Sequence, residues 1–204
     1  MNFNKLIMKN RRDFLKKSTI GFLGTIISPK IIKAKMENNI NYSEKKLPTV
    51  ISTWRHGLAA NVEAMKILKK GGKSIDAVES GVRVSEADPE CNSVGYGGWP
   101  DREGIVTLDA CIMDETGNCG SVSFLQNIMH PISVARMVMD KTPHVMLSGK
   151  GAQQFALENG FKKENLLTTK SEKRWKKWLE KSEYKPIINI ENHDTIGLLA
   201  LDNN

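Results

Sequence analysis

The chain has 204 residues, of which 40% are hydrophobic, as is typical of one soluble globular domain with a short extension. Its formal net charge is +7, but residues 1–34 alone contain eight Lys/Arg and one acidic residue, so the rest of the chain is neutral on balance. This distribution argues against a nucleic-acid-binding domain and against stable membrane association.

Residues 1–34 have the pattern of an export signal. The pair Arg11-Arg12 precedes an uncharged, mostly apolar stretch, Ser18–Ile27. Paired arginines before a short apolar region are typical of the twin-arginine route, and this stretch is about half the ~20 residues that a spanning helix needs. We therefore expect a periplasmic or secreted protein, with a polar linker over residues 35–47. A basic amphipathic helix or a membrane anchor is the alternative.

The chain contains three cysteines, Cys91, Cys111 and Cys119, an odd number that leaves one unpaired in an exported protein. Cys111 lies in an apolar run and is predicted to be a buried thiol. A bridge between Cys91 and Cys119 stays open, because sequence does not supply its geometry. No Cys/His spacing indicates zinc, so we expect neither a metal nor a cofactor.

From Pro48 onward the pattern alternates between strands and helices. Residues 48–54 predict a buried strand, and residues 59–70 predict a helix that ends before two glycines. Ser74 is a candidate cap for a second helix, which Asp88-Pro89 ends. The next predicted elements are a Gly/Pro-rich loop over 89–104, hairpin strands over 105–114 and 120–125, a helix over 131–142, a strand over 144–149 and a helix over 151–160.

Residues 161–188 are rich in charge and poor in core-type side chains, so they predict a surface arm. Ser171 is a candidate cap for a short helix within it. Its basic residues are interpreted as a solvated face, with a binding patch as the alternative. A final apolar run, 195–202, predicts a strand that begins at Thr195.

The tripeptide His193-Asp194-Thr195 suggests self-cleavage. A threonine that becomes an N-terminus holds a nucleophilic hydroxyl and a base, its own α-amine, in one residue. Attack of the hydroxyl on the preceding carbonyl converts the amide to an ester, which water then opens. Taken by itself, the tripeptide is better explained as an ordinary loop-to-strand junction, because short motifs often arise by chance.

Several further motifs change that interpretation because they occur together in one order along the chain. The motifs are STW at Ser52–Trp54, SVGYGGWPDREG at Ser93–Gly104, VTLDACIMD at Val106–Asp114, HPISVAR at His130–Arg136, KTPHVML at Lys141–Leu147 and NHDTIGLLALD at Asn192–Asp202. Together they resemble the glycosylasparaginase family of N-terminal-nucleophile hydrolases, also called aspartylglucosaminidases, from about Pro48 to the last residue.

The resemblance implies an α+β fold, the αββα four-layer sandwich, cut between Asp194 and Thr195. It implies Thr195 as the nucleophile, His193 and Asp194 as residues that assist the cut, and Trp54 and Ser93 as residues that line the substrate site. The implied substrate is a small glycosylated asparagine, and the implied assembly is a homodimer of αβ units. On this reading 48–194 is the α-chain portion and 195–204 is the first strand of the β chain.

The same resemblance implies a β-chain segment that this sequence does not contain. In the family that segment supplies the oxyanion hole and the groups that hold the substrate's α-carboxylate and α-amine. We therefore expect the chain alone to be inactive and prone to aggregation. Two other interpretations remain: an L-asparaginase or isoaspartyl peptidase, and a catalytically dead fragment. Arg55 and His56 depart from the family pattern, so we expect a locally different substrate fit. For His56 a structural or solvated role is the simpler interpretation.

Overall fold

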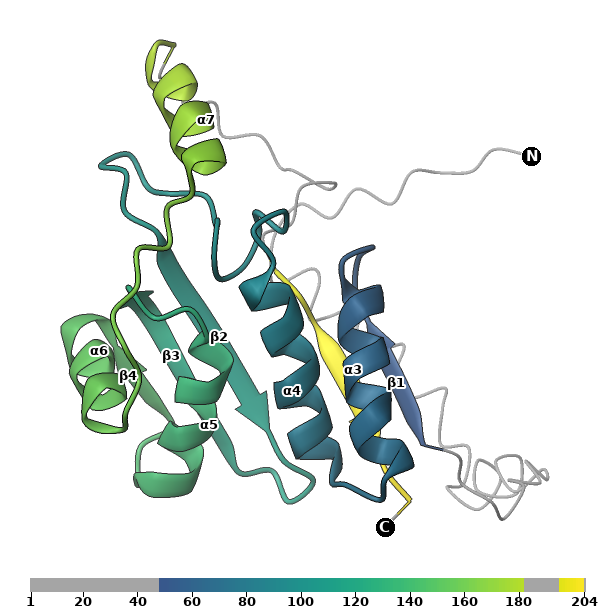
Figure 1. The fold of residues 1–204 in the computed structure, drawn as a ribbon. Coiled ribbons are helices and arrows are strands. Elements are labelled where there is room, and N and C mark those ends of the chain that lie inside the picture. Colours follow the sequence, from purple (N-terminus) through teal and green to yellow (C-terminus); the bar gives the residue numbers. More distant parts are fainter. Residues whose placement is uncertain (1–47, 182–194, 204) are drawn as a thin grey trace, which may run out of the picture. The chain divides into compact units, whose positions relative to one another are not determined.

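The computed structural model describes residues 48–181 and 195–203, which lie within one compact unit, Lys46–Asn204. The predicted signal, the predicted linker, His193 and Asp194 lie outside the described residues. The described chain combines helices with two β-sheets, which confirms a mixed α and β fold (Figure 1). None of its described helices is long and apolar enough to cross a bilayer.

The first sheet joins the two ends of the described chain. Strand β1 (Thr49–Ser52) pairs antiparallel with β5 (Leu198–Leu201), with Ser52 opposite Leu198. The sequence predicted both strands, but β5 begins at Leu198 and not at Thr195. Thr195 therefore lies on the approach to the strand.

The second sheet is built on the predicted hairpin. Strands β2 (Thr107–Met113) and β3 (Cys119–Gln126) are antiparallel, and β4 (Met146–Ser148) adds to β3 in parallel. The side chain of Asp114 holds the connecting turn by accepting hydrogen bonds from the backbone N–H groups of Thr116 and Asn118, at 2.9 and 3.0 Å.

Helices cover one face of each sheet (Figure 1). Helices α3 (Gly57–Lys69) and α4 (Ser74–Ala87) pack on each other and on β1 and β5. Gly81 permits this close approach, because a Cβ there would lie 2.7 Å from the carbonyl oxygen of Ala60. Helices α5 (Pro131–Lys141) and α6 (Gly149–Glu158) pack on the second sheet.

The main core lies between the second sheet and its helices. Its buried members come from β2, β3, α4, α5, α6 and the segment between β3 and α5, and Ile196 and Leu198 pack against it from the other end of the chain. The largest of its fully buried side chains are Val122, Leu125, Ile128, Val134 and Val138.

Among the described residues, the opposite faces of the two sheets carry exposed apolar side chains. On the first sheet Ile51 is 62% exposed and Leu199 is 74% exposed. On the second sheet Met113 and Met146 are also exposed. The prediction that Cys111 is buried was wrong, because its position in β2 directs it to this open face; all three cysteines are free thiols.

The predicted cap of α4 was also wrong. Ser74 is the first residue of the helix and makes no capping hydrogen bond with its side chain. Its backbone N–H instead donates to the carboxylate of Asp202, at 2.7 Å, which places a negative charge at the positive end of the helix. This cap could not be predicted locally, because Asp202 lies just beyond β5.

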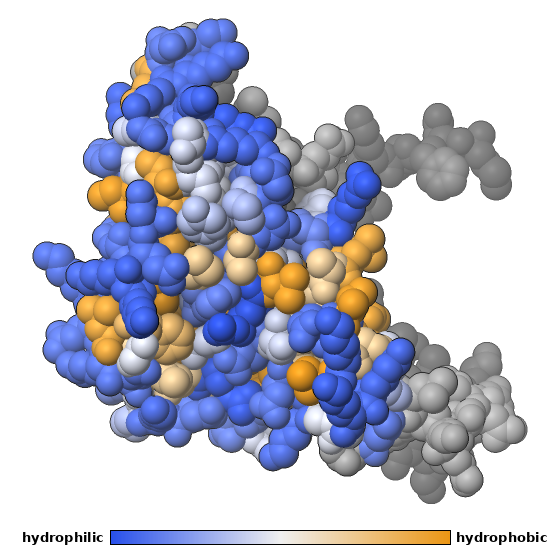
Figure 2. Space-filling view, in the orientation of Figure 1, coloured by the Kyte–Doolittle hydropathy of each residue, from blue (hydrophilic) through white to orange (hydrophobic). Residues whose placement is uncertain are grey.

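Helix α7 (Thr169–Leu179) is the predicted helix of the charged arm. Its surface is mainly hydrophilic (Figure 2). The cap is Thr168, whose side chain accepts a hydrogen bond from the backbone N–H of Ser171, so the prediction of Ser171 as the cap was wrong. Ser171 instead lies in the first turn of the helix, where its side chain is buried.

Candidate functional site

Thr195 lies at the edge of the first sheet, three residues before β5, and is exposed. The segment that it begins is held to the opposite strand at Gly197. The backbone N–H of Thr53 donates to the carbonyl of Gly197, and the N–H of Gly197 donates to the hydroxyl of Thr53, both at 2.9 Å. The hydroxyl of Thr195 itself forms no hydrogen bond with another described residue.

Trp54 occupies a tight turn directly after Thr53. Its φ is 61°, in the left-handed region that a bulky side chain rarely adopts, and the N–H of Gly57 donates to its carbonyl at 3.2 Å. The side chain is 44% exposed. Backbone strain of this kind concentrates at functional sites. The structure thus brings Trp54 and Thr195 to the same end of the β1–β5 pair.

Two polar atoms near this turn are buried without a hydrogen-bond partner among the described residues, Ser52 Oγ and His56 Nε2. Burial lowers the pKa of His56 below its ordinary value of 6.5, and the nearby carboxylate of Asp88 opposes this effect. Burial therefore favours the neutral imidazole of His56, whose Nε2 has no hydrogen-bond partner among the described residues. A neutral imidazole can accept or donate a proton.

Ser93 lies in the loop that follows α4. The loop rests on the last turn of that helix: the N–H of Tyr96 donates to the carbonyl of Glu86 at 2.7 Å. Gly95 has a φ of 59°, and a Cβ there would lie 2.1 Å from the same carbonyl oxygen, so only glycine fits. The single polar neighbour of the Ser93 hydroxyl among the described residues is the thiol of Cys91, at 3.9 Å.

The side chain of Glu86 is 2% exposed and joins α4 to α5. One carboxyl oxygen accepts a hydrogen bond from the N–H of Ile132 at 3.0 Å, in the first turn of α5, and the other lies 3.2 Å from Nδ1 of His130. Burial raises the pKa of Glu86 above its ordinary value of 4.5, although these two contacts and the charge of Arg83 oppose the rise. Glu86 therefore fixes the helix end on which the Ser93 loop rests.

Helix α7 holds the same loop from its other side. The hydroxyl of Ser171 donates to the carbonyl of Gly97 at 2.6 Å, and the indole N–H of Trp175 donates to the carbonyl of Arg102 at 3.2 Å. The guanidinium of Arg174 lies 5.6 Å from the ring centre of Trp99. The arm predicted as a surface extension thus anchors the loop that carries Ser93.

Ser93 is connected to the Trp54 turn only indirectly. The hydroxyl of Ser85, on the last turn of α4, donates to the carbonyl of His56 at 3.4 Å. Among the described residues, no hydrogen bond joins Ser93 to Thr195. The three predicted site residues that the structure describes therefore fall into one group, Trp54 with Thr195, and one separate residue, Ser93.

Sequence reasoning missed two residues that organise this region, Thr53 and Glu86. Thr53 lies inside the STW motif, but its partner is 144 residues away. Glu86 ends a helix with an ordinary apolar pattern, and a buried carboxylate there gives no local signal. Nothing in the composition indicated either role.

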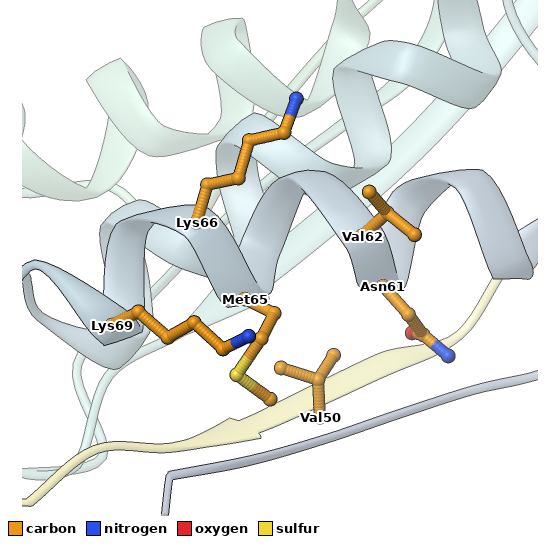
Figure 3. A pocket seen from close by; sticks show the side chains of 6 residues that line it. All are labelled: Val50, Asn61, Val62, Met65, Lys66 and Lys69. Carbon is orange, nitrogen blue, oxygen red and sulfur yellow. The ribbon is translucent and has the colours of Figure 1, made fainter.

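A pocket of about 390 Å³ lies away from all of these residues, between α3 and the edge of β1. Figure 3 shows Met65 and Val50 approaching each other across it, while Lys66 points away from β1. It contains none of the predicted site residues. Among residues 48–181 and 195–203, no group of three or more His, Cys, Asp or Glu side chains is arranged to hold a metal ion.

Comparison with known proteins gives a family match that covers most of the chain. Residues 30–204 match the family model described as "Asparaginase". A protein of Elizabethkingia miricola named N(4)-(Beta-N-acetylglucosaminyl)-L-asparaginase is 63% identical over 196 residues, which is 95% of this chain and 56% of that protein.

Two mammalian relatives carry a different name, isoaspartyl peptidase/L-asparaginase. The Mus musculus protein is 41% identical over 81% of this chain and 50% of its own length. The Bos taurus protein is 43% identical over 71% of this chain and 48% of its own length. The chain therefore spans about half the length of the curated relatives that it matches.

Proposed function

Because this chain belongs to the asparaginase family, we propose that it forms part of an amidohydrolase that cleaves N4-(β-N-acetylglucosaminyl)-L-asparagine to aspartate and the glycosylamine. The observation that carries the proposal is the 63% identity to the Elizabethkingia protein of that name. The matched residues make up 56% of that relative, and we propose that the remaining segment is required for turnover.

The proposed maturation step is self-cleavage between Asp194 and Thr195. The Thr195 hydroxyl oxygen bonds to the carbonyl carbon of Asp194, the C–N bond breaks, and the hydroxyl proton passes to the released nitrogen. Water then opens the ester, so that Asp194 gains a carboxylate and Thr195 regains its hydroxyl. The exposed hydroxyl at the start of an anchored segment supports this assignment. In this scheme His193 assists the cut.

After the cut the α-amine of Thr195 serves as the base. Its pKa of about 8 in peptides suits proton transfer near neutral pH. The amine takes the hydroxyl proton as the oxygen attacks the substrate amide, and returns it to the departing nitrogen, which leaves as the glycosylamine. A water molecule then releases aspartate from the ester on Thr195. The reaction needs neither a metal nor another cofactor.

We assign substrate contacts to Trp54 and Ser93. The support for Trp54 is its exposed side chain and strained backbone beside the Thr195 segment. The support for Ser93 is its place in a loop that Glu86 and Ser171 hold from two sides. A binding group must be held in place by the residues around it, and these contacts hold the Ser93 loop.

The four-layer αββα sandwich is part of the same proposal. Each sheet has helices on one face, while the other face exposes apolar side chains such as Ile51 and Met113. A sheet normally buries its apolar face against another layer. A second sheet, supplied by the segment that the relatives contain and this chain does not, would provide that layer.

Export by the twin-arginine route and assembly as a homodimer of αβ units are further proposals. The first rests on Arg11-Arg12 and the short apolar stretch that follows, and cell fractionation tests it. The second rests on the family resemblance, and sedimentation of the completed enzyme tests it.

The decisive experiment uses the chain completed with the corresponding C-terminal residues of the Elizabethkingia relative. We expect the wild type to split into two pieces at Asp194–Thr195 and to hydrolyse glycosylated asparagine. Thr195→Ala should remain intact and lose at least about 10³-fold in turnover, because the nucleophile is absent. Thr169→Ala, at an exposed position in α7, is the matched control and should behave as the wild type.

Intact mass and product release report the two activities separately. Splitting of Thr195→Ala at the same bond would contradict the proposal. An intact, inactive wild type would instead favour a catalytically dead protein.

The second candidate function is that of an L-asparaginase or isoaspartyl peptidase, because the Mus musculus relative of that name is 41% identical. Assays with glycosylated asparagine, free asparagine and β-aspartyl dipeptides separate the two. We expect the highest kcat/KM for the glycosylated substrate.

A further inference from the structure

The β1–β5 pairing ends in an unusual way at Thr53 and Gly197. The register runs from Thr49 opposite Leu201 to Ser52 opposite Leu198, so Thr53 and Gly197 are the next pair. In a regular antiparallel ladder such a pair exchanges two hydrogen bonds between backbone groups. Here only the first is regular, from the N–H of Thr53 to the carbonyl of Gly197.

The second hydrogen bond uses a side chain. The N–H of Gly197 donates to Oγ1 of Thr53 at 2.9 Å, so the hydroxyl takes the place of the Thr53 carbonyl. This substitution leaves the backbone of Thr53 free to leave the ladder. The chain turns at once, and Trp54 adopts its left-handed conformation in that turn.

The hydroxyl therefore does two things that a regular strand end cannot do together. It keeps the incoming segment paired as far as Gly197, two residues from Thr195, and it allows the opposite strand to turn so that Trp54 lies beside that segment. Without the hydroxyl, the N–H of Gly197 would lose its acceptor, and the Thr53–Gly197 pair would keep only one of its two hydrogen bonds.

We propose that Thr53 is a positioning residue for the nucleophile: its hydroxyl fixes the segment Thr195–Gly197 and so aligns the hydroxyl of Thr195 with the carbonyl that it attacks. This inference rests on the proposed function. Displacement of a reacting group by about 1 Å can reduce its rate about 10²-fold. Thr53 acts through Gly197 and does not itself touch the reacting atoms.

The test compares Thr53→Val, which removes the hydroxyl at constant shape, with Thr53→Ser, which restores it. The matched control is Thr107→Val, at the first residue of β2, where the hydroxyl makes no hydrogen bond with another described residue. All three are made in the completed enzyme. The measurements are the first-order rate of self-cleavage, kcat and KM, and amide hydrogen exchange of the peptide that contains Gly197.

We expect Thr53→Val to slow self-cleavage and lower kcat by about 10- to 100-fold, with KM within about twofold of wild type. Exchange should increase in the Gly197 peptide and not elsewhere. Thr53→Ser should recover most of both rates, and Thr107→Val should change neither. A general loss of folding would instead increase exchange throughout and would not be rescued by serine.

Wild-type rates in Thr53→Val, alongside an active wild type, would overturn the inference and leave the proposed function intact. Equal losses in Thr53→Val and Thr53→Ser would also overturn it. If the wild type neither splits nor turns over substrate, the proposed function fails and the alignment role falls with it; the exchange measurement then decides only whether the hydroxyl holds the strand.

Discussion

Glu86 is the residue whose behaviour with pH follows most directly from its surroundings. Burial raises the pKa of its carboxyl group, so the folded protein binds this proton more tightly than the unfolded chain. The resulting contribution to the free energy of unfolding is fully present below about pH 4.5, which is the ordinary pKa of the group. It is lost as the pH rises through the folded-state pKa.

Replacement of Glu86 by Gln should remove that loss. The amide oxygen can still accept from the N–H of Ile132, and the amide N–H can donate to His130. We expect the stability of Glu86→Gln relative to wild type to increase as pH rises above about 4.5, because no buried charge has to form. Urea unfolding at a series of pH values measures the difference.

Glu90→Gln is a control for which the expected change of stability with pH has the opposite sign. Lys170 lowers the pKa of Glu90 through a hydrogen bond and its charge, so the wild type should lose stability relative to this variant as pH falls. A constant difference between Glu86→Gln and wild type at every pH would contradict the buried-carboxyl account.

Whether a single residue could be singled out from the sequence depended on how local its signal is. Trp54 and Thr195 were named from short motifs, and the structure places them at one end of one sheet, but their chemical roles stay predictions. The roles of Thr53 and Glu86 depend on partners that lie far along the chain, and no local pattern encodes them. His193 and Asp194 lie outside the described residues, so their roles remain predictions.

At the scale of secondary structure, α7 is the element whose role differs most from expectation. Ser171 is buried, donates to the carbonyl of Gly97 and lies within hydrogen-bonding distance of the Thr168 hydroxyl. Trp175 packs against Gly104, where an added Cβ would lie 2.7 Å from the ring. The helix therefore stabilises the Ser93 loop, and the loop stabilises the helix.

Ser171→Ala should release this helix. The change leaves the carbonyl of Gly97 buried without its partner, at a cost of about 1–3 kcal/mol. We expect faster tryptic cleavage within 169–179, with the rest of the molecule still folded. Thr169→Ala, in the same helix, should be cleaved at the wild-type rate; equal rates for the two variants would show that Ser171 does not anchor α7.

Most helices and strands could be predicted because their apolar spacing and their Gly or Pro ends are local features. The hairpin of β2 and β3 was confirmed for this reason. The irregular point inside it was not predicted: Phe124 has a φ of 51°, and its N–H donates to the carboxylate of Asp109 across the sheet at 2.8 Å. Such a bulge depends on the register between two strands, which cannot be predicted from the local sequence.

At the scale of the whole molecule, the open sheet faces should control how the chain behaves alone. Exposed apolar sheet faces promote association. We expect the 204-residue chain by itself to associate as its concentration rises, and the double change Ile51→Lys with Leu199→Lys to reduce this association. Light scattering over a range of concentrations measures it.

The matched control is the pair Leu58→Lys with Val62→Lys. These side chains are 63% and 61% exposed, close to the value for Ile51, but they lie on α3. They should change the association little, although they add the same charge. An equal effect of both pairs would mean that net charge, and not the open face, governs solubility.

The large sequence separation between β1 and β5 also determines the order in which parts of the structure form. Thr53 and Gly197 are 144 residues apart, so their contact must wait until the ribosome has released almost all of the described chain. Helices and hairpins complete much earlier than a closure over that distance. Under the proposed function, the Thr195 hydroxyl is therefore brought into alignment last, and an incompletely synthesised chain would not cut itself.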